Sequence, residues 1–177
     1  MIRANKTLGF FLIVIYFFSG FAALVYQVVW QRWLVFFTGM SSVNISLIVS
    51  AFMAGLGIGY LVGGYLADKL KPGQHVTAFL LAELGIGLFA VFSKNIFYDG
   101  LYMQNQAASL SLVMTYALLF VLLLVPTFLM GVSLPLLSKS FNNFGNQGNF
   151  ISLLYFTNTL GSAIGTFAAA FYLIPLR

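Results

Sequence analysis

AFMAGLGIGYLVGGYLADKLKP, residues Ala51 to Pro72, decides the fold class of this chain. Most of it is apolar, and small residues recur at every fourth position. Positions four apart share one face of a helix, so these residues form a ridge that another backbone can approach closely. So many glycines would destabilise a helix in water, but in lipid the helix persists because unpaired amides have no solvent partner. The stretch therefore predicts a membrane helix with a packed face, formed by Ala51, Gly55, Gly59, Gly63 and Ala67.

The composition places the whole chain in the same class. Of its 177 residues, 61% are hydrophobic and 6% are charged, and the mean hydropathy is +1.00. A soluble domain carries about a quarter charged residues, so the sequence predicts an all-α, polytopic membrane protein. Cysteine is absent, which excludes disulfides and thiol chemistry. One histidine and three carboxylates leave little material for catalysis, and we expect no catalytic site, metal or cofactor.

Five apolar stretches predict a single transmembrane domain of about five helices over residues 1–177. The fourth contains Pro126 and Pro135, which a membrane bundle tolerates when neighbouring helices satisfy the freed backbone groups. We expect the longest connection, Lys94 to Ser109, to lie along the membrane interface, and a sixth helix to begin near Pro175. The predicted helices cover residues 8–30, 45–67, 76–92, 110–137 and 150–173.

Aromatic and basic residues mark the predicted helix ends. Trp30 and Trp33 flank Arg32 where the first helix ends, a pattern typical of anchors at the membrane–water interface. His75 follows a proline and a glycine, and we expect it to be a solvated loop residue.

The basic residues predict the orientation of the chain. Cytoplasmic loops carry an excess of Lys and Arg, and an N-terminus inside the cell places five of the eight basic residues on the cytoplasmic side. No basic cluster is dense enough to indicate nucleic-acid binding. The predicted cytoplasmic loop after the second helix contains Asp68, Lys69 and Lys71, and Arg3, Lys6 and Lys139 share that side, opposite Arg32, Lys94 and Arg177.

A polar layer is predicted inside the membrane. With a rise of about 1.5 Å per residue, Glu83 lies roughly 10 Å and Asn158 roughly 12 Å from the cytoplasmic ends of their helices. Gly59 lies at a similar depth. An isolated carboxylate there is costly, so we expect Glu83 to face the bundle interior near Asn158. Two interpretations stay open: a proton or cation site, or a structural hydrogen bond between helices.

Further motifs accompany the central stretch. The fifth predicted helix has a second face of small residues, which includes Gly161 and Gly165. Other segments are FFSGFAALVYQVVWQRWL (Phe17 to Leu34), LAELGIGLFA (Leu81 to Ala90), PTFLMGVSLPLLSK (Pro126 to Lys139) and LYFTNTLGSAIGTFAAAFYLIPL (Leu154 to Leu176). Together with Ala51 to Pro72, and in this order, they resemble bacterial membrane proteins related to spermidine synthase.

This resemblance implies a membrane region that precedes a cytoplasmic aminopropyltransferase-like domain with a Rossmann-like fold. The present sequence contains no such α/β domain, no glycine-rich nucleotide loop and no acidic cluster for a polyamine, so no catalytic residue is carried over. A second similarity links GGYLADKLKP (Gly63 to Pro72) to a cytoplasmic loop of major facilitator transporters.

Two functions follow from these resemblances. The first is a non-catalytic membrane module that anchors or packs against partner subunits, or a second copy of itself, in the bilayer of a bacterial inner membrane. The module would be an enzyme only as part of a longer chain with an aminopropyltransferase domain. The alternative is a transporter-like unit for a small cationic or amphipathic solute, with Glu83 as the counter-charge.

Overall fold

The computed structural model describes residues 6–39, 42–103, 111–141 and 147–173. These residues form helices and no strand, which confirms the all-α prediction. In chain order the elements are α1 (Lys6–Thr38), α2 (Ser42–Lys69), α3 (Gln74–Lys94), η1 (Asn95–Met103), α4 (Leu112–Ser140), α5 (Gln147–Ala168) and η3 (Ala169–Leu173). The two η segments are π-helical continuations of α3 and α5.

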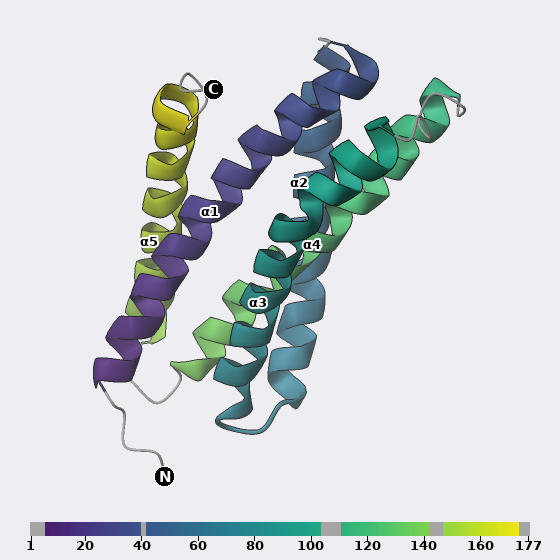
Figure 1. The fold of residues 1–177 in the computed structure, drawn as a ribbon. Helices are drawn as coiled ribbons and strands as arrows, with labels where there is room; N and C mark the ends of the chain where they lie inside the picture. Colours follow the sequence, from purple (N-terminus) through teal and green to yellow (C-terminus); the bar gives the residue numbers. More distant parts are fainter. Residues whose placement is uncertain (1–5, 40–41, 104–110, 142–146, 174–177) are drawn as a thin grey trace.

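The five α-helices divide into two groups (Figure 1). α1 packs along α5 in one group, and α4 packs along both α2 and α3 in the other. Successive helices run in opposite directions, so α1, α3 and α5 point one way and α2 and α4 the other. Backbones approach closely within each group, whereas the two groups meet mainly through side chains.

Four of the helices are long and apolar enough to cross a membrane. Between 22% and 39% of the residues in the apolar stretch of each span are buried inside the protein, so most of them keep some outward-facing surface. Leu61, Val91 and Val113, for example, have exposed fractions of 78%, 73% and 78%. Continuous apolar surface of this kind is a liability in water and is solvated by lipid tails. These helices therefore fit a membrane environment.

The glycine ridge of α2 packs against α4. Gly55, Gly59 and Gly63 are all buried. A Cβ atom at Gly59 would collide with the carbonyl oxygen of Phe128 and would lie 2.8 Å from the Cα of Gly131. Backbone atoms cannot turn aside as a side chain can, so this approach requires glycine on both helices.

A second ridge brings α5 against α1. A Cβ atom at Gly161 would collide with the carbonyl oxygen of Phe17, and one at Gly165 would collide with that of Phe21. Both glycines are buried. The two ridges therefore explain the close α2–α4 and α1–α5 contacts.

Aromatic side chains fill the space where backbones stay apart. Trp30 is 2% exposed, and its ring centroid lies 6.2 Å from that of Phe52 on α2 and 5.5 Å from that of Phe89 on α3. Nearer the other end of α1, the Tyr16 and Phe79 rings meet edge to face at 6.1 Å. Tilted and edge-to-face pairs at these distances are favourable, so they join the two helix groups.

α1 differs from its prediction. It continues to Thr38, beyond the predicted end at residue 30. The prediction that Trp30 is an interfacial anchor is wrong, because the side chain is buried in the core. The same aromatic pattern serves a buried cluster when neighbouring helices supply aromatic partners, as Phe52 and Phe89 do here.

The prediction for His75 is also wrong. Its side chain is 7% exposed, and its Nε2 lies 2.9 Å from the carbonyl oxygen of Ala67. Gly73, with φ of 97°, turns the chain sharply before α3 begins. This turn brings the first turn of α3 against the last turn of α2 and buries the imidazole.

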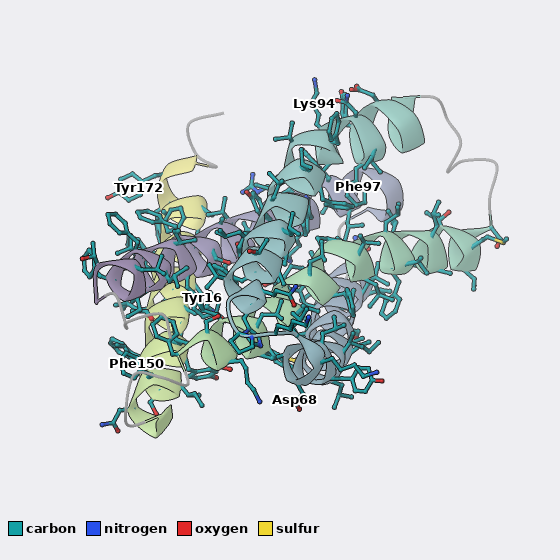
Figure 2. The ribbon with its side chains drawn as sticks, turned by 90° about the horizontal axis from the view of Figure 1, so that it is seen from below. Tyr16, Asp68, Lys94, Phe97, Phe150 and Tyr172 are labelled. Atoms are coloured by element: carbon teal, nitrogen blue, oxygen red, sulfur yellow. The ribbon has the colours of Figure 1, made fainter. Side chains whose placement is uncertain are left out.

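The segment after α3 is helical where a connection along the interface was predicted. Asn95–Met103 forms η1, and Phe97 within it is 1% exposed. Figure 2 shows Phe97 directed toward the neighbouring helices, while Lys94 points outward. The Phe97 ring packs 6.2 Å from Trp33, so the segment is fixed to α1.

The remaining helices begin and end within three residues of their predicted bounds, if η3 is counted with α5. α5 is not one of the four helices that are long and apolar enough to cross a membrane, because polar residues such as Asn158 interrupt its apolar sequence. A fifth membrane span therefore stays a prediction. Arg3, Arg177, the start of a sixth helix and residues 104–109 lie outside the described residues.

Candidate functional site

Glu83, on α3, is the centre of a polar contact between three helices. Its Oε1 accepts a hydrogen bond from the hydroxyl group of Ser19 on α1, at 2.9 Å. The Ser133 hydroxyl group on α4 lies beside this carboxyl group, and it donates its hydrogen to the carbonyl oxygen of Leu129 at 3.2 Å. The Glu83 side chain is half-buried. A carboxylate in apolar surroundings is costly unless hydrogen bonds compensate for the lost water, and the hydrogen bond from Ser19 provides part of that compensation here.

Asn158, on α5, meets α1 at the same level. A Cβ atom at Gly20 would collide with the backbone oxygen of Asn158 and would lie 2.6 Å from its Oδ1. One turn further along α5, Ser162 donates a hydrogen bond to the Gly20 carbonyl oxygen at 3.1 Å. Glu83 and Asn158 therefore contact neighbouring residues of α1, Ser19 and Gly20. Within the described residues, no hydrogen bond joins Glu83 directly to Asn158.

A partly enclosed cavity of about 140 Å³ lies between the two helix groups, beside these residues. Helices α1, α2, α4 and α5 all contribute to its wall. Five polar side chains line it: Tyr16, Ser19, Tyr60, Asn158 and Ser162.

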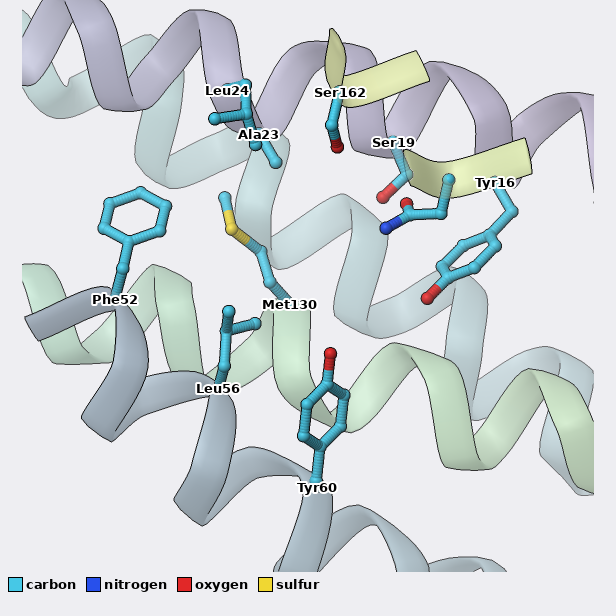
Figure 3. A pocket seen from close by; sticks show the side chains of 10 residues that line it. Tyr16, Ser19, Ala23, Leu24, Phe52, Leu56, Tyr60, Met130 and Ser162 are labelled. Atoms are coloured by element: carbon cyan, nitrogen blue, oxygen red, sulfur yellow. The ribbon is translucent and has the colours of Figure 1, made fainter. Parts of the chain in front are cut away.

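The cavity has a polar end and an apolar end (Figure 3). The hydroxyl groups of Tyr16, Ser19 and Tyr60 point into the space at one end, and aliphatic and aromatic side chains lie at the other. An arrangement of this kind suits an amphipathic molecule better than a purely apolar or purely polar one. The apolar end is lined by Ala23, Leu24, Phe52, Leu56 and Met130.

The residues predicted to form a cytoplasmic loop lie at one end of the bundle, away from the cavity. Asp68 forms a salt bridge of 2.5 Å with Lys139 on α4, and their side chains are 70% and 40% exposed. The Lys69 ammonium lies 4.3 Å from the centre of the Tyr65 ring, and Lys71 is exposed. Exposed pairs of this kind contribute little to stability.

Sequence reasoning identified Glu83 and Asn158 but missed their neighbours. Tyr16 and Ser19 lie on the face of α1 that lines the cavity. Their spacing of three residues, which places two polar side chains on one face of a largely apolar helix, was the signal that could have identified them. Ser162 was not predicted as a partner of α1. Only the packing of α1 on α5 brings that hydroxyl to the site.

The three carboxylates of the chain do not gather at one site. Asp68 is at the end of α2, Glu83 is within α3, and Asp99 is in η1. At the usual helical rise per residue, Glu83 and Asp99 are separated by roughly 24 Å along the helix axis. Within the described residues, no group of three or more His, Asp and Glu side chains is placed to hold a metal ion.

Comparison with known proteins gives one informative similarity. No protein-family model matches the chain, and no solved structure matches it. The sequence is 28% identical over 159 residues to polyamine aminopropyltransferase 2 of Aquifex aeolicus (strain VF5). The alignment covers 90% of this chain and 30% of that relative. The chain thus spans less than a third of the relative's length, and the similarity supports the resemblance to spermidine synthase-like proteins.

Proposed function

We propose that this chain is a membrane module of a polyamine aminopropyltransferase-like system, in which it acts as an anchor or accessory subunit and not as the catalyst. The observation that carries the proposal is the extent of the similarity, which covers 90% of this chain but 30% of the relative. In this chain the shared portion is a bundle of helices, four of which are long and apolar enough to cross a membrane.

The distribution of carboxylates supports a non-catalytic role. Aminopropyl transfer requires a site that holds two polar substrates together with acidic groups in fixed positions. Asp68 is engaged with Lys139 at an exposed helix end, and Glu83 is bonded to Ser19 inside the bundle. These two carboxylates therefore belong to separate contacts between helices.

The proposed location is the cytoplasmic membrane of a bacterium, with the N-terminus inside. Lys69, Lys71 and Lys139 lie toward one end of the bundle and Lys94 toward the other, as the directions of α2, α3 and α4 require. An excess of basic residues marks the cytoplasmic side. The proposed partners are the lipid bilayer and other membrane subunits or a second copy of this chain.

The orientation is tested with single cysteines, because the chain has none of its own. Lys71→Cys is expected to react with a membrane-impermeant maleimide only in inside-out vesicles, and Lys94→Cys only in right-side-out vesicles. The reverse pattern would overturn the proposed orientation.

The anchor function is tested on the tagged chain isolated from its native membrane in a mild detergent. We expect a complex larger than the 19.5 kDa chain, with aminopropyl transfer by the complex and none by the separated chain. Transfer by the chain alone would contradict the non-catalytic role. A chain that elutes without any partner would contradict the accessory role.

A transporter-like function is the second candidate, and the polar cavity beside Glu83 favours it. Proteoliposomes that contain the purified chain would then take up a labelled organic cation, and Glu83→Gln would abolish the uptake. Asp68→Asn is the matched control, since that carboxylate is exposed and remote from the cavity. Uptake that is equal in both variants would exclude Glu83 as the counter-charge.

A further inference from the structure

We propose that the cavity between the two helix groups binds a small aliphatic monoamine. Its ammonium group lies at the polar end, near Ser19 and Ser162, and its hydrocarbon chain lies at the apolar end, near Phe52 and Met130. This binding goes beyond the anchor function and does not require that any solute cross the membrane.

The polar end of the cavity offers acceptors to a hydrogen-bond donor. A serine hydroxyl group has one hydrogen to donate and two lone pairs that accept. Ser19 donates its hydrogen to Glu83 at 2.9 Å, and Ser162 donates its hydrogen to the carbonyl oxygen of Gly20 at 3.1 Å. Both hydroxyl oxygens therefore remain as acceptors toward the cavity. The Tyr16 and Tyr60 hydroxyl groups at this end can accept as well as donate, so an amine or an alcohol that donates hydrogen bonds finds acceptors on all four side chains.

Glu83 favours a cationic donor over a neutral one. Its carboxyl group lies one hydrogen bond behind Ser19, and none of the described residues that line the cavity is basic. A cation in the cavity favours the ionised form of this group. Opposite charges attract more strongly in a low-dielectric interior than in water. A protonated amine therefore gains an attraction that an alcohol of the same size does not.

The size and the apolar end limit the ligand to one amine. An engineered apolar cavity of about 150 Å³ holds benzene, and this cavity measures about 140 Å³. A ligand with about as many non-hydrogen atoms as benzene therefore fits. A second ammonium group would meet Phe52, Leu56 and Met130, which offer it no strong acceptor.

The ligand class is tested by calorimetric titration of the purified chain in lipid nanodiscs. The probes share one chain length: n-pentylamine, pentan-1-ol, pentanoate and cadaverine, which is the corresponding diamine. Empty nanodiscs correct for partition into lipid. We expect saturable binding of one pentylamine per chain, and at least roughly tenfold weaker binding of the other probes, because each leaves a polar group unpaired or lacks the charge. Absence of saturable pentylamine binding, or equal binding of any other probe, overturns the proposal.

The position of the site is tested with a matched pair of variants. Ala23→Leu fills the apolar end of the cavity, whereas Ala163→Leu adds the same volume on an exposed face of α5. Pentylamine binding is expected to be lost in the first variant and kept in the second. Glu83→Gln should weaken pentylamine binding by roughly tenfold, because it removes the charge attraction that acts from behind Ser19, and leave pentanol binding unchanged. Unchanged pentylamine binding in Ala23→Leu or in Glu83→Gln overturns the proposal. The helical signal in circular dichroism shows which variants fold. The titration of the unmodified chain with the four probes tests the ligand class without any variant.

Discussion

Ser19 on α1 and Glu83 on α3 are 64 positions apart in the sequence, and a hydrogen bond of 2.9 Å joins their side chains. This bond crosses the boundary between the two helix groups, where the other close pairs include the aromatic contacts of Tyr16 and Trp30. The carboxylate thus belongs to the packing of the bundle and, through Ser19, to the wall of the cavity.

A double-mutant cycle measures what this bond contributes. We expect Ser19→Ala and Glu83→Leu to be coupled by about 0.5–2 kcal/mol in the free energy of unfolding, the range for hydrogen bonds between membrane helices. Glu83→Gln should retain most of the stability, because its amide oxygen still accepts the bond from Ser19. The measurement is detergent-induced unfolding followed by circular dichroism. Additive effects of the two substitutions would show that the bond is not energetically significant.

The glycine ridge of α2 offers a sharp test of the α2–α4 contact. Gly59→Leu should destabilise the chain by roughly 1–3 kcal/mol or more, because the new side chain would overlap the backbone of α4. Gly57→Leu is the control on the same helix, since a Cβ atom at Gly57 meets nothing within 4 Å. Thermal unfolding of both variants in one detergent compares them. Similar midpoints would mean that Gly59 faces lipid.

The aromatic core predicts a large effect at Trp30. Trp30→Ala removes a side chain that is 2% exposed, and we expect a loss of about 3–5 kcal/mol. Phe18→Ala on the same helix removes a side chain that is 60% exposed and should cost far less. Unfolding free energies of the two variants check this difference. A small loss at Trp30 would indicate an interfacial position after all.

His75 is expected to stabilise the turn between α2 and α3. Its imidazole bonds the carbonyl oxygen of Ala67 in the last turn of α2. His75→Leu leaves that oxygen without this donor, and we expect a loss of about 1–3 kcal/mol. His75→Gln keeps a donor and should lose less. Equal stability of the parent and both variants in thermal unfolding would show that the imidazole is solvated.

The Asp68–Lys139 pair should contribute little. Both side chains are substantially exposed, and exposed ion pairs contribute about 0–1 kcal/mol. Lys139→Ala is therefore expected to shift the unfolding free energy within that range, less so at high salt because ions screen the pair. A larger loss would mean that this helix end is shielded from solvent.

The sequence was sufficient for the class and the approximate extent of most helices. Two local patterns carried this information: apolar runs near the length of a membrane span, and glycines at every fourth position. Both can be recognised without knowing which helix is the packing partner. The sequence also marked Glu83 and Asn158, because polar groups are rare in apolar helices. It misplaced Trp30 and His75, since aromatic and polar residues near a helix end have the same local pattern whether they face solvent or another helix.

Which helices pair was decided only by the tertiary structure. Two small-residue ridges were visible in the sequence, on α2 and on α5, but nothing local states that the first packs on α4 and the second on α1. The same holds for the cavity, whose polar wall combines Ser19, Tyr60 and Ser162 from three helices. Helical periodicity depends only on neighbours along the chain, so the sequence determines which residues share a face of a helix. The partner of that face depends on steric fit between segments distant in sequence, so it emerges only when all five helices are packed together.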